Sequence, residues 1–254
     1  MKLSLIILFF ITAALYASVG FGGGSTYNAL LVMAGTDTLV QPLIALACNI
    51  IVVSGNVVRY YHAKLLTFKR YIPLIILSVP MAWFGGSLPI SQKLFIGLLA
   101  LALIFAGIRL LFRTFMADQE QVISTPNTKA IPTALIGGGV GFYAGLVGIG
   151  GGIFLAPILH FMRWGNAKAI AAACSFFILV NSIAGLIGQS QKLAHMEQLE
   201  KALPYWPLLP AVFLGGFIGN HIGIFKLSDI WIKRLTAILI LYVAIRLSLN
   251  WLTL

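Results

Sequence analysis

Two glycine clusters are the residues of this chain whose type and spacing could do chemistry. They are Gly20-Phe21-Gly22-Gly23-Gly24 and Gly148-Ile149-Gly150-Gly151-Gly152, about half a chain apart, each between two hydrophobic runs. Three consecutive glycines break a helix, and such a run can aim successive backbone N–H groups into one concavity. The helix that starts after each cluster adds the positive end of its dipole. The clusters therefore predict a backbone site for an oxyanion, without a fixed positive charge.

Polar side chains near the clusters could complete this site. Hydroxyls and amides donate hydrogen bonds to sulfonate-like oxygens, although bonds between helices are an equally open explanation for each of them. The second half has Ile153-Phe154 where the first has Ser25-Thr26, so we expect the first half to supply more polar side chains. The predicted substrate-binding residues are Gly20, Gly22, Gly23, Gly24, Ser25, Thr26, Asn28, Asn49, Gly148, Gly150, Gly151, Gly152, Ser175 and Asn181.

The composition predicts an all-α polytopic membrane protein. Of the 254 residues, 60% are hydrophobic and 9% charged, more apolar surface than a soluble fold could hide. The six acidic residues lie at loops or segment ends, so neither an acidic proton relay nor a cation cage is visible. Cys48 and Cys174 lie in apolar stretches without metal-ligand spacing. We expect no cofactor, metal or nucleic-acid partner, and leave open a coupling proton or ion.

The hydrophobic segments occur in the same order twice, which predicts two homologous repeats. Residues 1–113 form the first repeat, 114–130 a polar linker and 131–254 the second. Tyr16-Ala17 recurs as Tyr143-Ala144, and Pro80 with Gly85-Gly86 recurs as Pro210 with Gly215-Gly216. The predicted segments are Leu3–Val19, Ser25–Ala34, Val40–Val58, Tyr71–Leu88 and Leu94–Phe112, then Ile131–Val147, Ile153–Met162, Ala169–Gly188, Tyr205–Ile222 and Trp231–Leu249.

The two short segments decide the topology. A helix of ten residues rises about 15 Å, half the hydrocarbon thickness, so Ser25–Ala34 and Ile153–Met162 do not cross a bilayer alone. If each forms a re-entrant hairpin with the segment before it, each repeat has three spanning helices and the repeats are inverted. If each is instead the second part of a broken helix, the repeats are parallel.

Positive charge favours the inverted hairpins. Lysine and arginine collect on the cytoplasmic side of short loops, and the loop Arg59–Arg70 is the strongest such signal. The inverted topology leaves only five of the 17 basic residues outside, whereas the parallel one leaves six and gathers three of them together. The net charge of +11 follows from the same rule and also fits an anionic substrate.

The paired clusters, the stretch from Ala144 to Gly152 with Pro157 beyond it, and the duplication resemble the sulfite exporter TauE/SafE family of membrane permeases. The resemblance covers nearly the whole chain. It implies a multi-pass permease of the bacterial inner membrane that moves a small sulfur-containing oxyanion, such as sulfite or an organosulfonate, usually outward. Ala29 stands where the second half has Pro157, so we expect an asymmetric site.

Other functions remain open or are disfavoured on the residues alone. A transporter of another small anion, such as a carboxylate, and an uptake permease both fit the same features. An enzyme does not, because the glycine clusters lack a following Lys-Ser/Thr and no catalytic grouping of polar residues occurs at helix spacing.

Overall fold

The computed structural model describes residues 3–115, 130–162, 164–165, 167–192 and 200–222, together with 241, 244–245, 248–249 and 251–252. These residues are helical without strands, as the composition predicted. Three described stretches, Gln41–His62, Ala130–Val147 and Lys168–Gln191, are long and apolar enough to cross a membrane. The helices are α1 Leu3–Ser18, α2 Gly24–Met33, α3 Gln41–His62, α4 Phe68–Ser87, α5 Gln92–Phe115, α6 Ala130–Val147, α7 Gly152–Phe161, α8 Ala167–Gln191, the 3-10 turn η1 Leu203–Tyr205 and α10 Leu208–Ile222.

The observed helices follow the predicted segments closely. The short helices α2 and α7 have ten residues each and begin one residue earlier than expected. The predicted segment Tyr205–Ile222 starts earlier than the helix, because Tyr205 belongs to the turn η1 and α10 begins at Leu208. The predicted linker stays a prediction because 116–129 lie outside the described residues, with α5 reaching Phe115 and α6 beginning at Ala130. The predicted segment Trp231–Leu249 falls almost entirely outside them.

The first glycine of each cluster ends the preceding helix. Gly20 has a φ of 86°, its N–H donates to Ala17 O, and the N–H of Phe21 donates to Tyr16 O. A glycine in the left-handed conformation with these two hydrogen bonds is a common helix C-cap. The bonds satisfy carbonyl groups that have no partner within the helix. Gly148, with a φ of 73°, ends α6 by donating to Ala144 O. Both helices therefore end at their glycine cluster because glycine adopts this conformation without strain.

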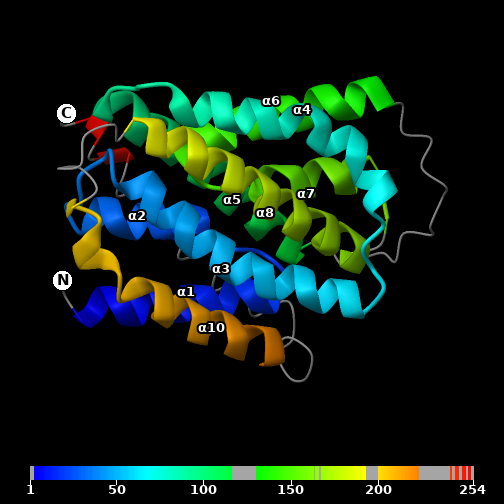
Figure 1. The fold of residues 1–254 in the computed structure, drawn as a ribbon, viewed down its shortest axis with the longest axis horizontal. Helices are drawn as coiled ribbons and strands as arrows, with labels where there is room; N and C mark the ends of the chain where they lie inside the picture. The colour runs from blue at the N-terminus through cyan, green and yellow to red at the C-terminus, as the bar shows by residue number, and fades with distance from the viewer. Residues whose placement is uncertain are drawn as a thin grey trace.

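The helices form a bundle whose neighbours come from different halves of the chain (Figure 1). The helices α4 and α6 pack together at one side, α1 and α10 at the other, and α3 and α8 lie between them. Gly137 and Gly145 of α6 face the carbonyls of Leu74 and Ala82 on α4, so α4 and α6 run parallel. In the same way, Gly215 and Gly219 of α10 face Phe10 and Ala14 of α1.

The two helix pairs run in opposite directions. Lys201, just before α10, contacts Asp37, just before α3, and Arg59 near the end of α3 donates to Asn220 O near the end of α10. The helices α1, α3 and α10 are therefore parallel to one another. Because a short turn reverses the chain between α3 and α4, α4 and α6 are antiparallel to them. Lys93, near the beginning of α5, lies with its Nζ 5.7 Å from the ring centre of Trp251.

The chain turns back on itself after α1. Gly20 lies against Tyr60 and Gly22 against Asn49 and Val53, and the 34–40 connection then leads into the beginning of α3. Residues 20–33 therefore run along α3 in the direction opposite to it. After α6 the same course is followed along α8, where Gly150 lies against Ser182 and Gly152 against Ile178.

Glycines bring the helix backbones of α4 and α6 into direct contact. A Cβ added at Gly145 would overlap the carbonyl oxygen of Ala82, and one added at Gly141 would overlap that of Ser78. Small residues permit this approach in membrane proteins, where association depends on close packing. Gly85 and Gly215, a pair of residues that the duplication predicts to be equivalent, also lie against carbonyls, those of Phe142 and Phe10.

We expect Gly145→Ala to lower the free energy of unfolding by about 1–3 kcal/mol, because the new methyl group has to push α4 and α6 apart. Gly139→Ala is the matched control on the same helix, since nothing lies within 4 Å of its added Cβ. The control should be neutral or stabilising by about 0.5–1 kcal/mol. Thermal unfolding of both variants in detergent measures the difference, and equal midpoints would contradict the close approach.

Candidate functional site

The two glycine clusters meet at one small cavity in the middle of the bundle. A Cβ added at Gly24 would lie 3.1 Å from the carbonyl oxygen of Ile149, so the two backbones nearly touch. No charged side chain lines the cavity within the part of the chain that the structure describes. Its lining residues are Tyr16, Phe21, Gly22, Gly23, Gly24, Ser25, Asn49, Ile149, Gly152, Ile153 and Ile178.

The N-termini of both short helices open onto this cavity. Gly24 and Ser25 begin α2, and Gly152 and Ile153 begin α7. The first amides of a helix have no partner within it, and each helix brings about half a positive charge to its N-terminus. Gly23 supplies the last turn before α2 with a φ of 90°. The cavity therefore combines backbone N–H groups that have no partner within their own helix with the positive potential of two helix N-termini.

Polar side chains of each half hold the cluster of the other half. Asn28 of α2 donates its Nδ2 to Val147 O at 3.0 Å and to Gly148 O at 2.8 Å. Ser175 of α8 donates its hydroxyl to Gly20 O at 2.5 Å. These carbonyls belong to the ends of α6 and α1, which have lost their helical partners. Asn28 and Ser175 thus fix the position of the helix breaks, and neither lines the cavity.

Asn49 is the side chain that lies against both clusters. It belongs to α3, is 1% exposed, and donates its Nδ2 to the hydroxyl of Ser182 on α8 at 2.9 Å. A Cβ added at Gly22 would overlap its Oδ1, and one added at Gly150 would overlap its Nδ2. Asn49 Oδ1 is buried and has no hydrogen-bond partner among the described residues. Asn28, Asn56 and Asn181 also have amide oxygens without a partner among the described residues, so Asn49 is distinguished by its place on the cavity wall, where a ligand could reach it.

The other predicted site residues divide between the cavity and its supports. Ser25 lines the cavity and its Oγ has no partner among the described residues. The hydroxyl of Thr26 bonds to the Tyr16 hydroxyl at 2.9 Å and so orients a residue of the cavity wall. Asn181 donates to Phe177 O one turn earlier in its own helix and does not reach the cavity. Gly151, with a φ of 81°, is the residue immediately before α7, and Gly23 has the same position and a similar conformation before α2.

Several residues of the site were missed from the sequence. Ile149, Ile153 and Ile178 contribute apolar side chains to the wall, and Tyr16 and Phe21 contribute aromatic ones. The recurrence of Tyr16-Ala17 as Tyr143-Ala144 marked the position of Tyr16 without indicating a function. Ser182 is a polar residue of the segment after the second cluster and a candidate from the sequence, but its bond to Asn49 depends on which faces of α3 and α8 meet.

In the described residues, a helical bundle with apolar spans surrounds a small cavity at two interrupted helices, an arrangement expected of a membrane transporter. The sulfite exporter TauE/SafE family model matches residues 5–247, and the chain belongs to that family. This confirms the resemblance drawn from the glycine clusters. The family and the relatives below are described as membrane transporters and not as enzymes, which fits the absence of a catalytic grouping in the sequence.

The relatives match along most of the chain. A probable membrane transporter protein of Sinorhizobium fredii is 34% identical over 96% of this chain and 97% of its own length. One of Methanocaldococcus jannaschii is 29% identical over 72% of this chain and 70% of its own length. One of Bacillus subtilis is 24% identical over 86% of this chain and 87% of its own length. No solved structure matches.

We expect Gly151→Val to abolish transport while the protein still reaches the membrane. A branched side chain strongly disfavours a φ of 81°, and the added Cβ would press on Phe177 and Ala144. Gly23→Val should behave alike because Gly23 has the equivalent position before α2. Gly139→Val, on an open face of α6, controls for insertion of valine. Substrate flux and the amount of protein in the membrane fraction are measured together. Wild-type flux in Gly151→Val would show that the glycine clusters are not part of the transport site.

Proposed function

We propose that this protein carries a small sulfur-containing oxyanion, such as sulfite or an organosulfonate, across the bacterial inner membrane, in the direction of export. The observation that carries the proposal is that the N-termini of α2 and α7 open onto one cavity. Two helix dipoles and two sets of free amides suit an anion and oppose a cation. Membership of the sulfite exporter family supports the sulfur-containing class.

Asn49 donates a hydrogen bond from Nδ2 to this anion after its side-chain amide rotates by a half turn. The oxygen and nitrogen of a side-chain amide exchange places by a half turn, and a serine hydroxyl either donates or accepts. With Asn49 Nδ2 bonded to Ser182, the unpaired Oδ1 would repel an oxyanion. After the half turn Ser182 donates to Oδ1, and Nδ2 faces the ligand. The cost of the rearrangement is small because the bond between the two side chains is kept.

We infer that the fold is a pair of inverted repeats, each with a re-entrant hairpin and three spanning helices. The parallel pairs α1 with α10 and α4 with α6 support this, because α1 and α6 then run in opposite directions. The return of residues 20–33 along α3 supports a hairpin in place of a broken helix. Interrupted helices that meet at the centre of inverted repeats are a frequent basis of alternating access. We propose that the anion is released to either side of the membrane by that mechanism.

For this topology we expect both termini outside and the turn at residues 63–67 in the cytoplasm. The reason is the concentration of Lys and Arg between Arg59 and Arg70, which stays on the cytoplasmic side. Reporters that are active in only one compartment, fused at the C-terminus and inserted after Lys64, measure both positions. A C-terminal reporter that is active in the cytoplasm would contradict the inverted topology with re-entrant hairpins and support the parallel repeats.

For the site we expect Asn49→Asp to abolish anion binding, because a carboxylate accepts the bond from Ser182 but offers no donor and adds a negative charge. Ser25→Ala should weaken binding by about 1–3 kcal/mol, the usual cost of a lost buried partner. Asn28→Ala should lower stability more than selectivity, since Asn28 bonds only to backbone carbonyls. Conservative changes at Ile153 and Phe154 should also lower stability more than selectivity, because their side chains carry no hydrogen-bond donor.

Binding of sulfite, organosulfonates of rising size and non-sulfur anions to purified protein measures these effects. Ile178→Val is the matched control because it changes the apolar wall without touching a donor. Unchanged binding of every anion in Asn49→Asp would mean that Asn49 does not contact the ligand. Equal loss of every anion in all variants would mean that the clusters are a structural junction of helix ends.

A further inference from the structure

Among the described residues, each end of the bundle has a contact between the segment that follows a short helix and a residue before or at the start of a helix from the other half. Lys201 Nζ, before α10, lies 3.1 Å from Asp37 Oδ2, after α2. Arg70, in the first turn of α4, donates to the carbonyl of Trp164, after α7, and its guanidinium lies 4.0 Å from the centre of a Trp164 ring. Asp37 precedes α3 and Arg70 follows it, and the 22 residues of α3 separate them by about 33 Å.

The two contacts occupy corresponding positions in the two halves. The helices α2 and α7 both begin at the cavity and both end at one of these contacts. The helices α10 and α4 both pack against the first helix of the other half, α1 and α6. A ten-residue helix behaves as a short rigid rod, so a tilt that widens its end at the cavity also moves its far end.

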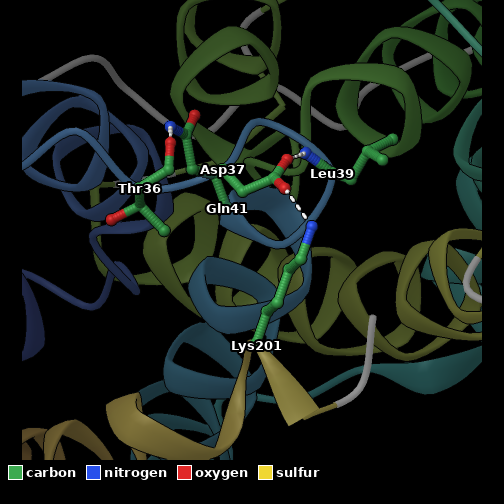
Figure 2. A network of polar contacts seen from close by, with 5 residues as sticks. All are labelled: Thr36, Asp37, Leu39, Gln41 and Lys201. Carbon is green, nitrogen blue, oxygen red and sulfur yellow. Dashed lines mark hydrogen bonds and ion pairs between the residues drawn. The ribbon is translucent and has the colours of Figure 1, made fainter. Parts of the chain in front are cut away.

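The Asp37 side chain is held in place by the loop around it. Figure 2 shows the Asp37 carboxylate between the backbone N–H of Leu39, at 3.0 Å, and the ammonium of Lys201. Gln41, which is 1% exposed, donates to Thr36 O and closes the base of the loop. The Leu39 amide lowers the pKa of Asp37 against the effect of its partial burial, and Lys201 lowers it further. The carboxylate is therefore charged and aimed at Lys201 at neutral pH.

The contact at the other end joins a buried aromatic ring to the partly exposed Arg70. Trp164 is 1% exposed, and Tyr71 stacks on it with ring centres 5.6 Å apart. The Asp37–Lys201 pair is exposed, with 37% and 56% of the two side chains accessible. An exposed ion pair is weak and screened by salt, whereas a cation–π contact on a buried ring, joined by a hydrogen bond to its backbone carbonyl, is stronger. The two ends therefore resist opening unequally.

We propose that the Asp37–Lys201 and Arg70–Trp164 contacts close the two ends of the transport path in turn, and that the end with Asp37 and Lys201 opens more readily. The proposal rests on the proposed function, because it assigns to α2 and α7 the movement that exposes the cavity to either side. Each contact breaks when its own end opens and is kept when the opposite end opens.

A cysteine in the cavity wall reports which end is open. Ile153→Cys is introduced after Cys48 and Cys174, both buried, are replaced by alanine. A membrane-impermeant maleimide is then applied to right-side-out and inside-out vesicles. We expect Asp37→Asn and Lys201→Gln to raise the labelling rate about 1.5- to fivefold from the face that bears residues 37 and 201, as the loss of an exposed ion pair implies. Labelling from the other face should fall, because one population gains what the other loses.

The other contact and the controls complete the experiment. Trp164→Leu should raise labelling from the opposite face. Glu200→Gln is the matched control because it removes one exposed negative charge beside Lys201 and keeps the pair. The exchanged pair Asp37→Lys with Lys201→Asp should restore the natural rates. High salt should increase labelling of the natural protein as Asp37→Asn does, and should leave Asp37→Asn unchanged.

Two kinds of failure are distinguishable. If Ile153→Cys reacts from either face but Asp37→Asn, Lys201→Gln and Trp164→Leu leave both rates unchanged, the assignment of the two contacts is wrong and the proposed function stands. The same conclusion follows if the exchanged pair fails to restore the rates. If Ile153→Cys reacts from neither face in any variant, while transport is retained, the cavity is not on the transport path and the proposed site falls with it.

Discussion

Unpaired backbone amides in an apolar interior are the constraint on which the rest of this structure depends. Each such group costs several kcal/mol in hydrocarbon, and each glycine cluster interrupts a helix where no lipid could satisfy it. The structure resolves this by ending α1 and α6 with left-handed caps at Gly20 and Gly148, and by turning the free amides of α2 and α7 toward one shared cavity. A polar cavity in the centre is therefore the condition under which the breaks can exist.

The same constraint ties the halves of the chain together. The carbonyls freed at the end of α6 are bonded by Asn28, and Gly20 O, just beyond the end of α1, is bonded by Ser175, so each break is completed by the other half. Asn49 and Ser182 add a bond between the two central helices at the same level. The glycines of α6 and α10 then let α4 and α1 approach closely enough to surround this centre. Neither half would satisfy its own break alone.

The sequence predicted the elements better than their contacts. Segment lengths and glycine clusters located α2 and α7 to within one residue, because hydrophobic length and helix-breaking residues act locally. The faces of the helices were not predictable, since lipid-facing and buried residues are equally apolar in such a chain. Asn28, Asn49 and Ser175 were recognised as polar residues near the clusters. That Asn49 lines the cavity, whereas Asn28 and Ser175 bond to backbone carbonyls beside it, depends on how α2, α3 and α8 are rotated about their axes. Asn181 illustrates the same limit, because its amide bonds within its own helix.

The unequal walls of the cavity bear on the shape of the anion under the proposed function. Both helix N-termini offer backbone donors, and the wall combines the polar side chains of Ser25 and Asn49 with the apolar side chains of Ile149, Ile153 and Ile178. An organosulfonate has three oxygens on one side of its sulfur and an apolar substituent on the other, and sulfite has a lone pair there. Such an anion satisfies the donors with its oxygens and leaves its less polar side to the isoleucines, which removes the cost of burying an unpaired polar group on that side. A carboxylate, with two oxygens, would leave more of these donors unpaired, so the asymmetry that separates the two glycine clusters in the sequence becomes a means of selection among anions.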